Sequence, residues 1–259
     1  GTESGTRKYG GDLTYRLNQP WSVGGEVFRQ ENLSTGAVRD MAELRGRYAM
    51  PGYEVFAGLR HVEDTLGTGE AHRSEQLFVG GKYQFTERLT GRIQHDQTLS
   101  STDQSVDYPT RTTVGLDYRV TKDTTVFADQ ELTRGDSADT ATTRVGFRSA
   151  PWTGAQIGST MEQQTTENGS RLFATTGLKQ SWQITKRWSA DTGMDRSATI
   201  RQTDGYTMNA SVPPASGGTE DFTAVYLGAA YRADTWSWTG RIENRHADSE
   251  DKVSTYLGA

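Results

Sequence analysis

The stretch at residues 77–95, LFVGGKYQFTERLTGRIQH, decides the fold of this chain. Every second residue from Leu77 to Phe85 is apolar or glycine, whereas the residues between them include Lys82 and Gln84. This two-residue period is typical of a β-strand with unlike faces. The run is interrupted at residues 86–88 and the alternation then resumes. The stretch therefore predicts a hairpin of two long strands joined by a tight turn.

The composition narrows the class of protein. The chain has 259 residues, enough for one large all-β unit or for two ordinary domains. Only 33% of the residues are hydrophobic and the mean hydropathy is −0.74, so a core of the usual kind would be thin. Aromatic residues nevertheless reach 10%, which is unlike a disordered chain. The net charge of −5 argues against a nucleic-acid partner, and the absence of cysteine excludes disulfides and thiolate metal sites.

The sequence contains no candidate for a membrane-spanning helix. Its longest apolar run, at residues 225–231, is far shorter than the ~18 residues that such a helix needs. Residues 1–10 contain no basic segment followed by an apolar one, so we expect a signal peptide to be absent or already removed. A membrane-spanning β-barrel fits the composition, because each strand needs only ~9–11 residues and half of them are apolar.

The hairpin pattern of residues 77–95 occurs about seven times along the chain, with a period of roughly 35 residues. The short interruptions lie at residues 18–20, 49–52, 86–88, 121–123, 149–151, 185–187 and 233–235. The connections between successive hairpins are longer and polar, and they lie at residues 30–37, 63–74, 98–110, 133–140, 163–170, 201–221 and 246–252. We therefore expect short turns at one end of the strands and long loops at the other.

Bulky residues, mostly aromatic, flank the short interruptions on the apolar phase. They include Tyr15, Trp21, Tyr48, Tyr53, Tyr83, Tyr118, Phe147, Trp152, Trp182, Trp188, Tyr231 and Trp236. Farther from the interruptions the same phase is aliphatic, as at Val55, Leu59 and Val79. An aromatic band beside an aliphatic one is typical of a membrane-interface girdle, which we predict here.

The opposite phase carries charged residues throughout. We single out as candidates for lining and selectivity in a polar lumen Arg16, Arg47, Arg92, Arg119, Arg148, Arg232, Asp129 and Glu131. A dry protein core would not hold so many charges, whereas a barrel lumen would. Four of the arginines directly follow a girdle aromatic, which predicts either a basic collar that selects anions or ion pairs with carboxylates such as Asp117 and Glu54. Glycines on this phase, such as Gly80 and Gly146, are expected to relieve crowding.

Taken together, these features resemble the bacterial outer-membrane β-barrel proteins, over nearly the whole chain. The resemblance is one of architecture, because segments such as YQFTERL, YRVTKDT and WQITKRW assign no subfamily. It implies an all-β, antiparallel up-and-down transmembrane barrel with about 14–16 strands in this chain. Residues 1–259 would form a single barrel domain or an internal segment of one. The odd strand count and the ending at residues 256–259 predict a barrel that continues beyond this chain.

The resemblance implies an outer-membrane pore or translocation passage in a Gram-negative bacterium. Its partners would be the lipid bilayer, lipopolysaccharide and a plug or translocated component. No phosphate loop, G-x-S-x-G or H-E-x-x-H pattern occurs and the four histidines show no ligand spacing, so we expect no enzyme, metal or cofactor. Two alternatives remain open: a barrel that anchors another component, and a soluble all-β repeat protein such as a propeller. The solute and the oligomeric state also stay open.

Overall fold

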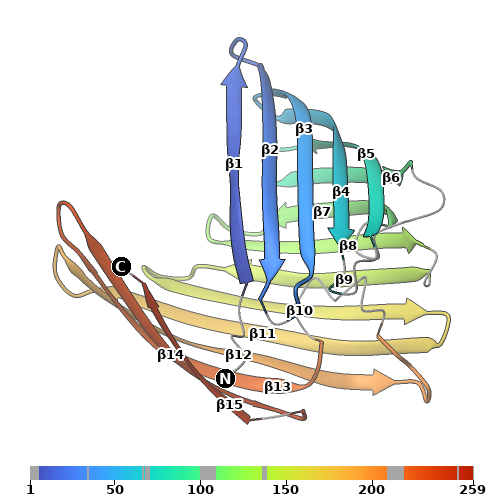
Figure 1. The fold of residues 1–259 in the computed structure, drawn as a ribbon. Helices are drawn as coiled ribbons and strands as arrows, with labels where there is room; N and C mark the ends of the chain where they lie inside the picture. The colour runs from blue at the N-terminus through green and yellow to red at the C-terminus, as the bar shows by residue number, and fades with distance from the viewer. Residues whose placement is uncertain are drawn as a thin grey trace. The chain divides into compact units, whose positions relative to one another are not determined.

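The computed structural model describes residues 6–33, 35–65, 67, 71–99, 109–135, 139–208, 219–249 and 251–258. These residues form antiparallel strands joined by turns and loops (Figure 1). The strands are β1 (Thr6–Arg16), β2 (Trp21–Asn32), β3 (Val38–Met50), β4 (Tyr53–Thr65), β5 (Ala71–Gln84), β6 (Leu89–Thr98), β7 (Thr110–Arg119), β8 (Thr124–Arg134), β9 (Thr140–Ser149), β10 (Ala155–Thr166), β11 (Gly169–Gln183), β12 (Trp188–Gln202), β13 (Phe222–Arg232), β14 (Ser237–Ala247) and β15 (Asp251–Gly258).

Strand order follows chain order from β1 to β15, so each strand pairs with its neighbours in the sequence. The described residues form fifteen strands in this up-and-down topology, which confirms the predicted fold class and strand number. A propeller would divide its strands into separate four-stranded sheets, so the propeller form of the soluble alternative is wrong. Among the residues described, no helix is long and apolar enough to span a membrane.

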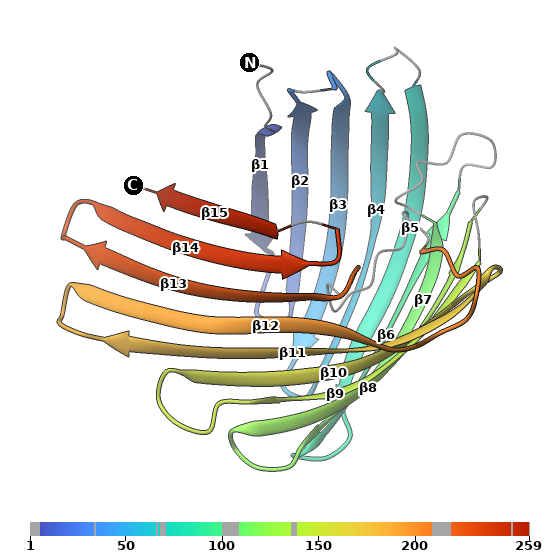
Figure 2. The same cartoon turned by 90° about the horizontal axis from the view of Figure 1, so that it is seen from below.

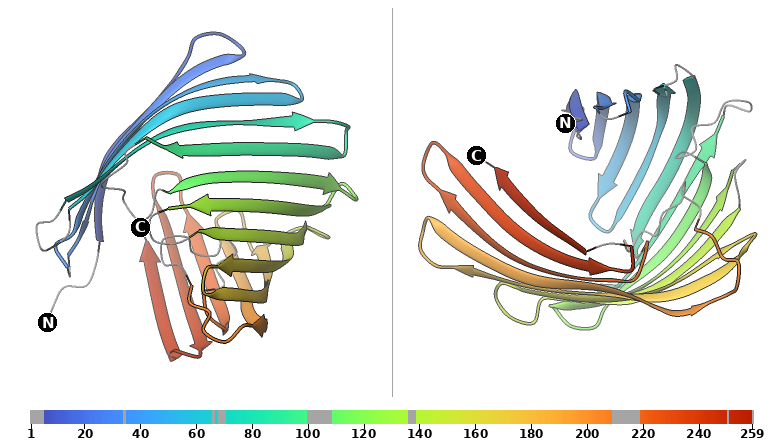
Figure 3. Two further views of the ribbon diagram at one scale, coloured as in Figure 1. Left: turned by 90° about the vertical axis from the view of Figure 1, so that its right-hand side faces the viewer. Right: turned by 60° about the horizontal axis from the view of Figure 1, so that its bottom comes forward.

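The chain divides into two compact units. One contains Gly1–Leu116, Gln130–Ala141 and Asn209–Val212, and the other contains Asp117–Asp129, Thr142–Met208 and Pro213–Ala259. Within each unit, consecutive strands run side by side in every view (Figures 2 and 3). The single domain inferred from the sequence stays a prediction.

Each predicted short interruption is a turn between the two strands of a hairpin. In the turn between β5 and β6, the Phe85 amide donates to the Leu89 carbonyl at 2.9 Å. The Thr86 hydroxyl accepts from the amides of Arg88 and Leu89 at 3.2 and 3.0 Å. Thr185 repeats this pattern between β11 and β12. The threonines that mark the interruptions therefore stabilise them by binding backbone donors.

Some of the connections predicted to be long loops are shorter in the structure, because the strands continue into them. Residues 163–170 were expected to form a loop, but β10 and β11 continue through them and Thr166 pairs with Gly169. That prediction is wrong, as is much of the loop expected at residues 63–74, because polar strand ends find partners across the hairpin. The Arg73 Nε lies 3.1 Å from Glu63 Oε2, for example. The central parts of the connections at 98–110 and 201–221 lie outside the described residues.

The strands have two unlike faces, as the alternation predicted. In β5, Gln76 and Phe78 are each 3% exposed, whereas Val79 on the other phase is 49% exposed. Ile93 and Trp236 are exposed by 56% and 58%. We call the crowded phase the inner face and the exposed apolar phase the outer face.

Glycine and aromatic side chains alternate on the inner face of neighbouring strands. A Cβ atom at Gly80 would lie 2.4 Å from the Phe56 ring, and one at Gly58 would lie 2.4 Å from the Phe78 ring. Gly146 stands in the same relation to Phe127, at 2.8 Å. These glycines therefore make room for a ring from the next strand, which confirms the expected relief of crowding.

Candidate functional site

Cross-strand ion pairs cover the inner face of the first unit. Register places Glu43 of β3 opposite Arg60 of β4, and Arg60 donates to Glu43 Oε2 from Nε at 2.9 Å and from Nη2 at 2.8 Å. Nearer the short turns, Arg47 binds Glu54 through two hydrogen bonds of 2.8 Å. Nearer the loops, Arg39 Nε lies 2.6 Å from Asp64. Charges on this face therefore have fixed partners instead of being buried alone.

Cations on the inner face also lie over the interior rings. The Arg60 guanidinium lies 5.2 Å from the centre of the Phe78 ring. In the second unit, Arg148 covers Phe127 at 5.0 Å and Arg241 covers Tyr226 at 3.6 Å. This arrangement shields the apolar rings and leaves charged groups at the surface of the inner face. The face is consequently polar although it contains aromatic residues.

Arg171 of β11, whose side chain is 5% exposed, joins several segments of the second unit. It donates to Thr199 Oγ1 at 2.9 Å, to the Thr219 carbonyl at 3.2 Å and to Asp221 Oδ1 at 3.0 Å. Asp221 also accepts from the amide and hydroxyl of Thr199. Burial by itself would raise the pKa of Asp221, but the hydrogen bonds from Thr199 and Arg171 outweigh it and lower that pKa below its ordinary value.

The start of the connection after β12 is also attached to the inner face. The Tyr206 hydroxyl donates to Gln164 Oε1 at 2.6 Å, and Asn168 Nδ2 donates to Thr207 at 3.1 Å. Burial raises the pKa of Tyr206, and the Glu162 carboxylate raises it further against the opposing effect of Arg171. Both described ends of this connection are thus held by residues of β10 and β11, near the loop ends of these strands.

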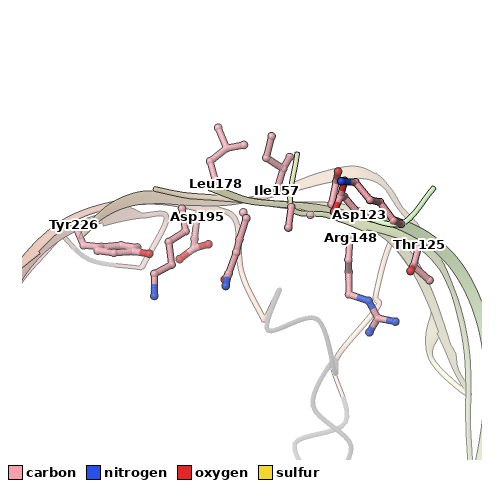
Figure 4. A pocket seen from close by; sticks show the side chains of 14 residues that line it. Asp123, Thr125, Arg148, Ile157, Leu178, Asp195 and Tyr226 are labelled. Carbon is pink, nitrogen blue, oxygen red and sulfur yellow. The ribbon is translucent and has the colours of Figure 1, made fainter. Parts of the chain in front are cut away.

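A hollow of about 620 Å³ lies against the second unit. Gly158 and Gly177 pair across β10 and β11 and leave its floor without side chains. Figure 4 shows Arg148, Asp195 and Tyr226 pointing to one side of the sheet, and Ile157 and Leu178 pointing to the other. At the hollow, polar and apolar side chains therefore lie on opposite faces of the sheet, as the sequence predicted.

The structure brings two of the predicted lining arginines together with carboxylates. Arg148 Nη2 donates to Asp117 at 2.7 Å, as one of the two sequence interpretations expected for the arginines that follow a girdle aromatic. Arg47, which is not one of those arginines, binds Glu54. Four further candidates interact with neighbouring groups, namely Arg92, Arg119, Asp129 and Glu131. Arg16 and Arg232 are exposed at the short-turn ends of β1 and β13, and neither has an ion pair within the part of the chain described. A collar of four unpaired arginines is therefore not what the structure contains, because Arg148 is paired.

The predicted girdle residues flank the short turns on the outer face. Tyr15, Trp152 and Trp236 are among the most exposed of them. Several contact each other across strands: ring centres lie 4.8 Å apart for Trp21 and Tyr48, and 4.9 Å apart for Trp188 and Tyr231. Their role at a membrane interface stays a prediction.

An apolar belt extends from these aromatic residues toward the loops and ends at a histidine or an arginine in strands β4 and β12. In β4 the outer phase runs from Tyr53 to Leu59 before His61. In β12 it runs from Trp188 to Met194 before Arg196. Sequence reasoning identified the two phases but missed where the belt stops. The end of the belt could have been found from the first histidine or charged residue on the outer phase of each strand.

Sequence reasoning also missed the contacts around Arg171, because they join residues up to fifty positions apart. The aromatic residues of the inner face had a detectable signal. Each stands on the polar phase, opposite or diagonal to a glycine of the next strand, as Phe56 does to Gly80. Within the described residues, no group of three or more histidine or acidic side chains is arranged to hold a metal ion.

No protein-family model matches the chain, and no curated protein matches its sequence. Solved structures do match its fold. A bacterial polysaccharide outer membrane secretin is 9% identical with a TM-score of 0.58, over 95% of this chain and 87% of the other. OprD from Pseudomonas aeruginosa is 10% identical with a TM-score of 0.55, over 97% and 89%. OccK11 (OpdR) from Pseudomonas aeruginosa is 10% identical with a TM-score of 0.51, over 97% and 88%.

The secretin and OprD are outer-membrane proteins, and the likeness extends along most of each chain. At such low identity it is evidence for the fold and not for a solute. The topology, the two unlike faces and the structural matches agree, so this chain has the antiparallel up-and-down β-barrel fold of the bacterial outer-membrane proteins.

Proposed function

We propose that this chain forms a passage across the bacterial outer membrane, with a polar lumen on its inner face and its long loops outside the cell. Lipid would contact the outer face, and lipopolysaccharide would contact the charged outer positions on the loop side of the belt. The fold shared with the outer membrane secretin and the outer membrane protein OprD supports this location. We propose no catalytic role.

The observation that carries the proposal is the contrast between the two faces. Val79, Ile93 and Trp236 are largely exposed on the outer face, where water would be unfavourable and lipid favourable. The inner face instead bears charge pairs such as Arg60 with Glu43 and Arg47 with Glu54. The Arg47–Glu54 pair, with side chains 48% and 29% exposed, would keep part of its hydration in a water-filled lumen, whereas a dry core would make its desolvation costly.

The pairing of these charges also affects which ions would pass through the lumen. An arginine bound to a carboxylate presents little net field to a passing ion, so Arg47 and Arg148 would contribute weakly to selectivity. Arg16 and Arg232 would contribute more, because they have no such partner among the described residues. We therefore propose a mild preference for anions at the short-turn end, instead of a strongly selective collar.

Planar-bilayer recording tests the proposal. The purified chain should give discrete conductance steps, and its reversal potential in a salt gradient should show mild anion preference. Heat-modifiable migration and retention in the outer-membrane fraction of an expressing cell would test the location. A fully inserted protein that never conducts would refute the passage.

The alternative of an anchoring barrel has one observation in its favour. Arg171 and Gln164 attach the described ends of the connection between β12 and β13 to the inner face. Silence in the bilayer recording, together with secure insertion, would favour this alternative.

A further inference from the structure

A groove of about 370 Å³ crosses the outer face of β4 to β7 in the first unit. Its walls include Tyr53, Val55, Tyr83, Phe85, Ile93 and Leu116. Two of its positions have no side chain. Gly81 of β5 pairs with Ile93, and Gly91 of β6 pairs with Tyr83, so the two glycines are diagonal neighbours on adjacent strands.

The Phe85 ring lies over Gly91, whereas the nearest side chain leaves Gly81 uncovered. A Cβ atom at Gly91 would lie 2.6 Å from the Phe85 ring and 3.6 Å from Leu116 Cδ2. At Gly81 it would lie 3.4 Å from Val55 Cγ1. Gly81 thus forms an open floor, with the Phe85 ring over Gly91 beside it and with aliphatic walls. This shape fits a long, thin, apolar occupant.

The groove belongs to the apolar belt, which meets lipid tails in this fold class. An acyl chain is therefore its occupant by continuity, and an unfilled groove would forfeit dispersion contacts. Tyr53 and Tyr83 belong to the girdle, which places the groove in the half of the belt nearest the short turns. The headgroup of a lipid in that leaflet would lie beside the turn at residues 85–88.

The turn that follows Phe85 carries a cation. Phe85 lines the groove and Arg88 follows three residues later, in a turn fixed by the hydrogen bonds of Thr86. Arg88 is exposed and has no ion pair within the residues that the structure describes. A guanidinium binds phosphate through paired, charge-assisted hydrogen bonds, so its charge complements an anionic headgroup.

We propose that this groove and Arg88 form a binding site for one phospholipid, with an acyl chain over Gly81 and against the Phe85 ring, and the phosphate at Arg88. The inference rests on the proposed membrane location, but it is independent of whether the lumen conducts. The proposal is that one lipid stays bound at this site, whereas the lipids around the rest of the belt exchange freely.

The turn at residues 185–187 offers a matched control. Thr185 accepts from the amides of Arg187 and Trp188 at 3.2 and 3.0 Å, as Thr86 does from its own neighbours. Arg187 lies 3.9 Å from Asp234, and both side chains are exposed. For the groove itself, Val55→Phe would add a ring to one wall. Val225→Phe makes the same change at an equally exposed outer position of β13.

Native mass spectrometry of the full chain in detergent, titrated with dilauroyl phosphatidylglycerol, tests the proposal. We expect one tightly bound lipid, with binding weakened about tenfold by Arg88→Ala through loss of a charge-assisted hydrogen bond. Val55→Phe should weaken it comparably, whereas Arg187→Ala and Val225→Phe should leave it unchanged. Equal loss in all four variants, or only a graded series of weakly bound lipids, would overturn the site.

Bilayer conductance separates this result from the proposed passage. Arg88→Ala should conduct as the parent chain does while losing its lipid. A parent chain that retains one lipid but never conducts would uphold the site and refute the passage. A parent chain that conducts but retains no lipid would refute the lipid site and uphold the passage.

Discussion

Replacing Arg171 by methionine should loosen the loop end of the second unit. The arginine donates hydrogen bonds of 2.9, 3.2 and 3.0 Å to Thr199, Thr219 and Asp221, and its side chain is 5% exposed. Bonds to charged groups contribute about 1.5–3 kcal/mol each when they are fully buried. Asp221 is 34% exposed, so water replaces part of what is lost. We expect the free energy of unfolding to fall by about 2–4 kcal/mol in total.

Urea unfolding of the protein in lipid vesicles, followed by tryptophan fluorescence, measures this change. Arg187→Met is the matched control, because Arg187 is exposed and only 3.9 Å from its exposed partner Asp234. The control should lie within about 0.5 kcal/mol of the parent chain. If the two variants unfold at the same urea concentration, the contacts of Arg171 do not stabilise the fold and the reasoning fails.

The same variant has a signature in its pH dependence. The pKa of Asp221 is lowered in the folded chain, so its carboxylate contributes stability above the unfolded pKa of ~3.9. That contribution disappears as the pH falls through the lowered folded pKa. Without Arg171 the folded pKa of Asp221 should move back toward its ordinary value. As the pH falls below about 4, the free energy of unfolding of the variant should therefore decrease less than that of the parent chain. An equal decrease in both proteins would contradict this account.

Three further outcomes follow from the two faces. Leu227→Arg, on the outer face, should cost about 2–4 kcal/mol of insertion free energy in vesicles, and normal insertion would contradict a lipid-facing belt. Gly80→Ala should destabilise folding by about 1–3 kcal/mol, because its Cβ would lie 2.4 Å from the Phe56 ring, and adding Phe56→Ala should reverse much of that loss in urea unfolding. Arg16→Gln should reduce anion preference in reversal-potential measurements more than Arg148→Gln does, since Arg148 already binds Asp117; a larger effect of Arg148→Gln would be inconsistent with charge pairing.

The fold was predictable because its rule is local. A period of two, broken at turn residues such as Thr86 and Thr185, determines strand, turn and face without reference to distant residues. The same rule failed where polarity alone was taken to mean a loop. At residues 163–170 polar side chains belong to paired strands, since Thr166 and Gly169 close a tight hairpin.

The candidate site was predictable only in kind. Alternation places Arg148 and Asp117 on the same face, but their 2.7 Å contact depends on the relative register of β7 and β9, which are not adjacent. The contacts of Arg171 with Asp221 depend on how a long connection returns to the sheet. Neither a period nor a motif encodes such geometry, so the sequence indicated a charged face without indicating which charges are neutralised.

The length of the apolar belt has a consequence for where the protein is stable. From Tyr53 to Leu59 the belt occupies seven residues of β4, or about 23 Å measured along the strand. A strand tilted by about 40° would turn this into roughly 18 Å of height, less than the ~25 Å typical of outer-membrane barrels. Hydrophobic mismatch penalises each ångström of excess bilayer thickness. Thin membranes should therefore retain this protein, and thicker ones would have to deform around it.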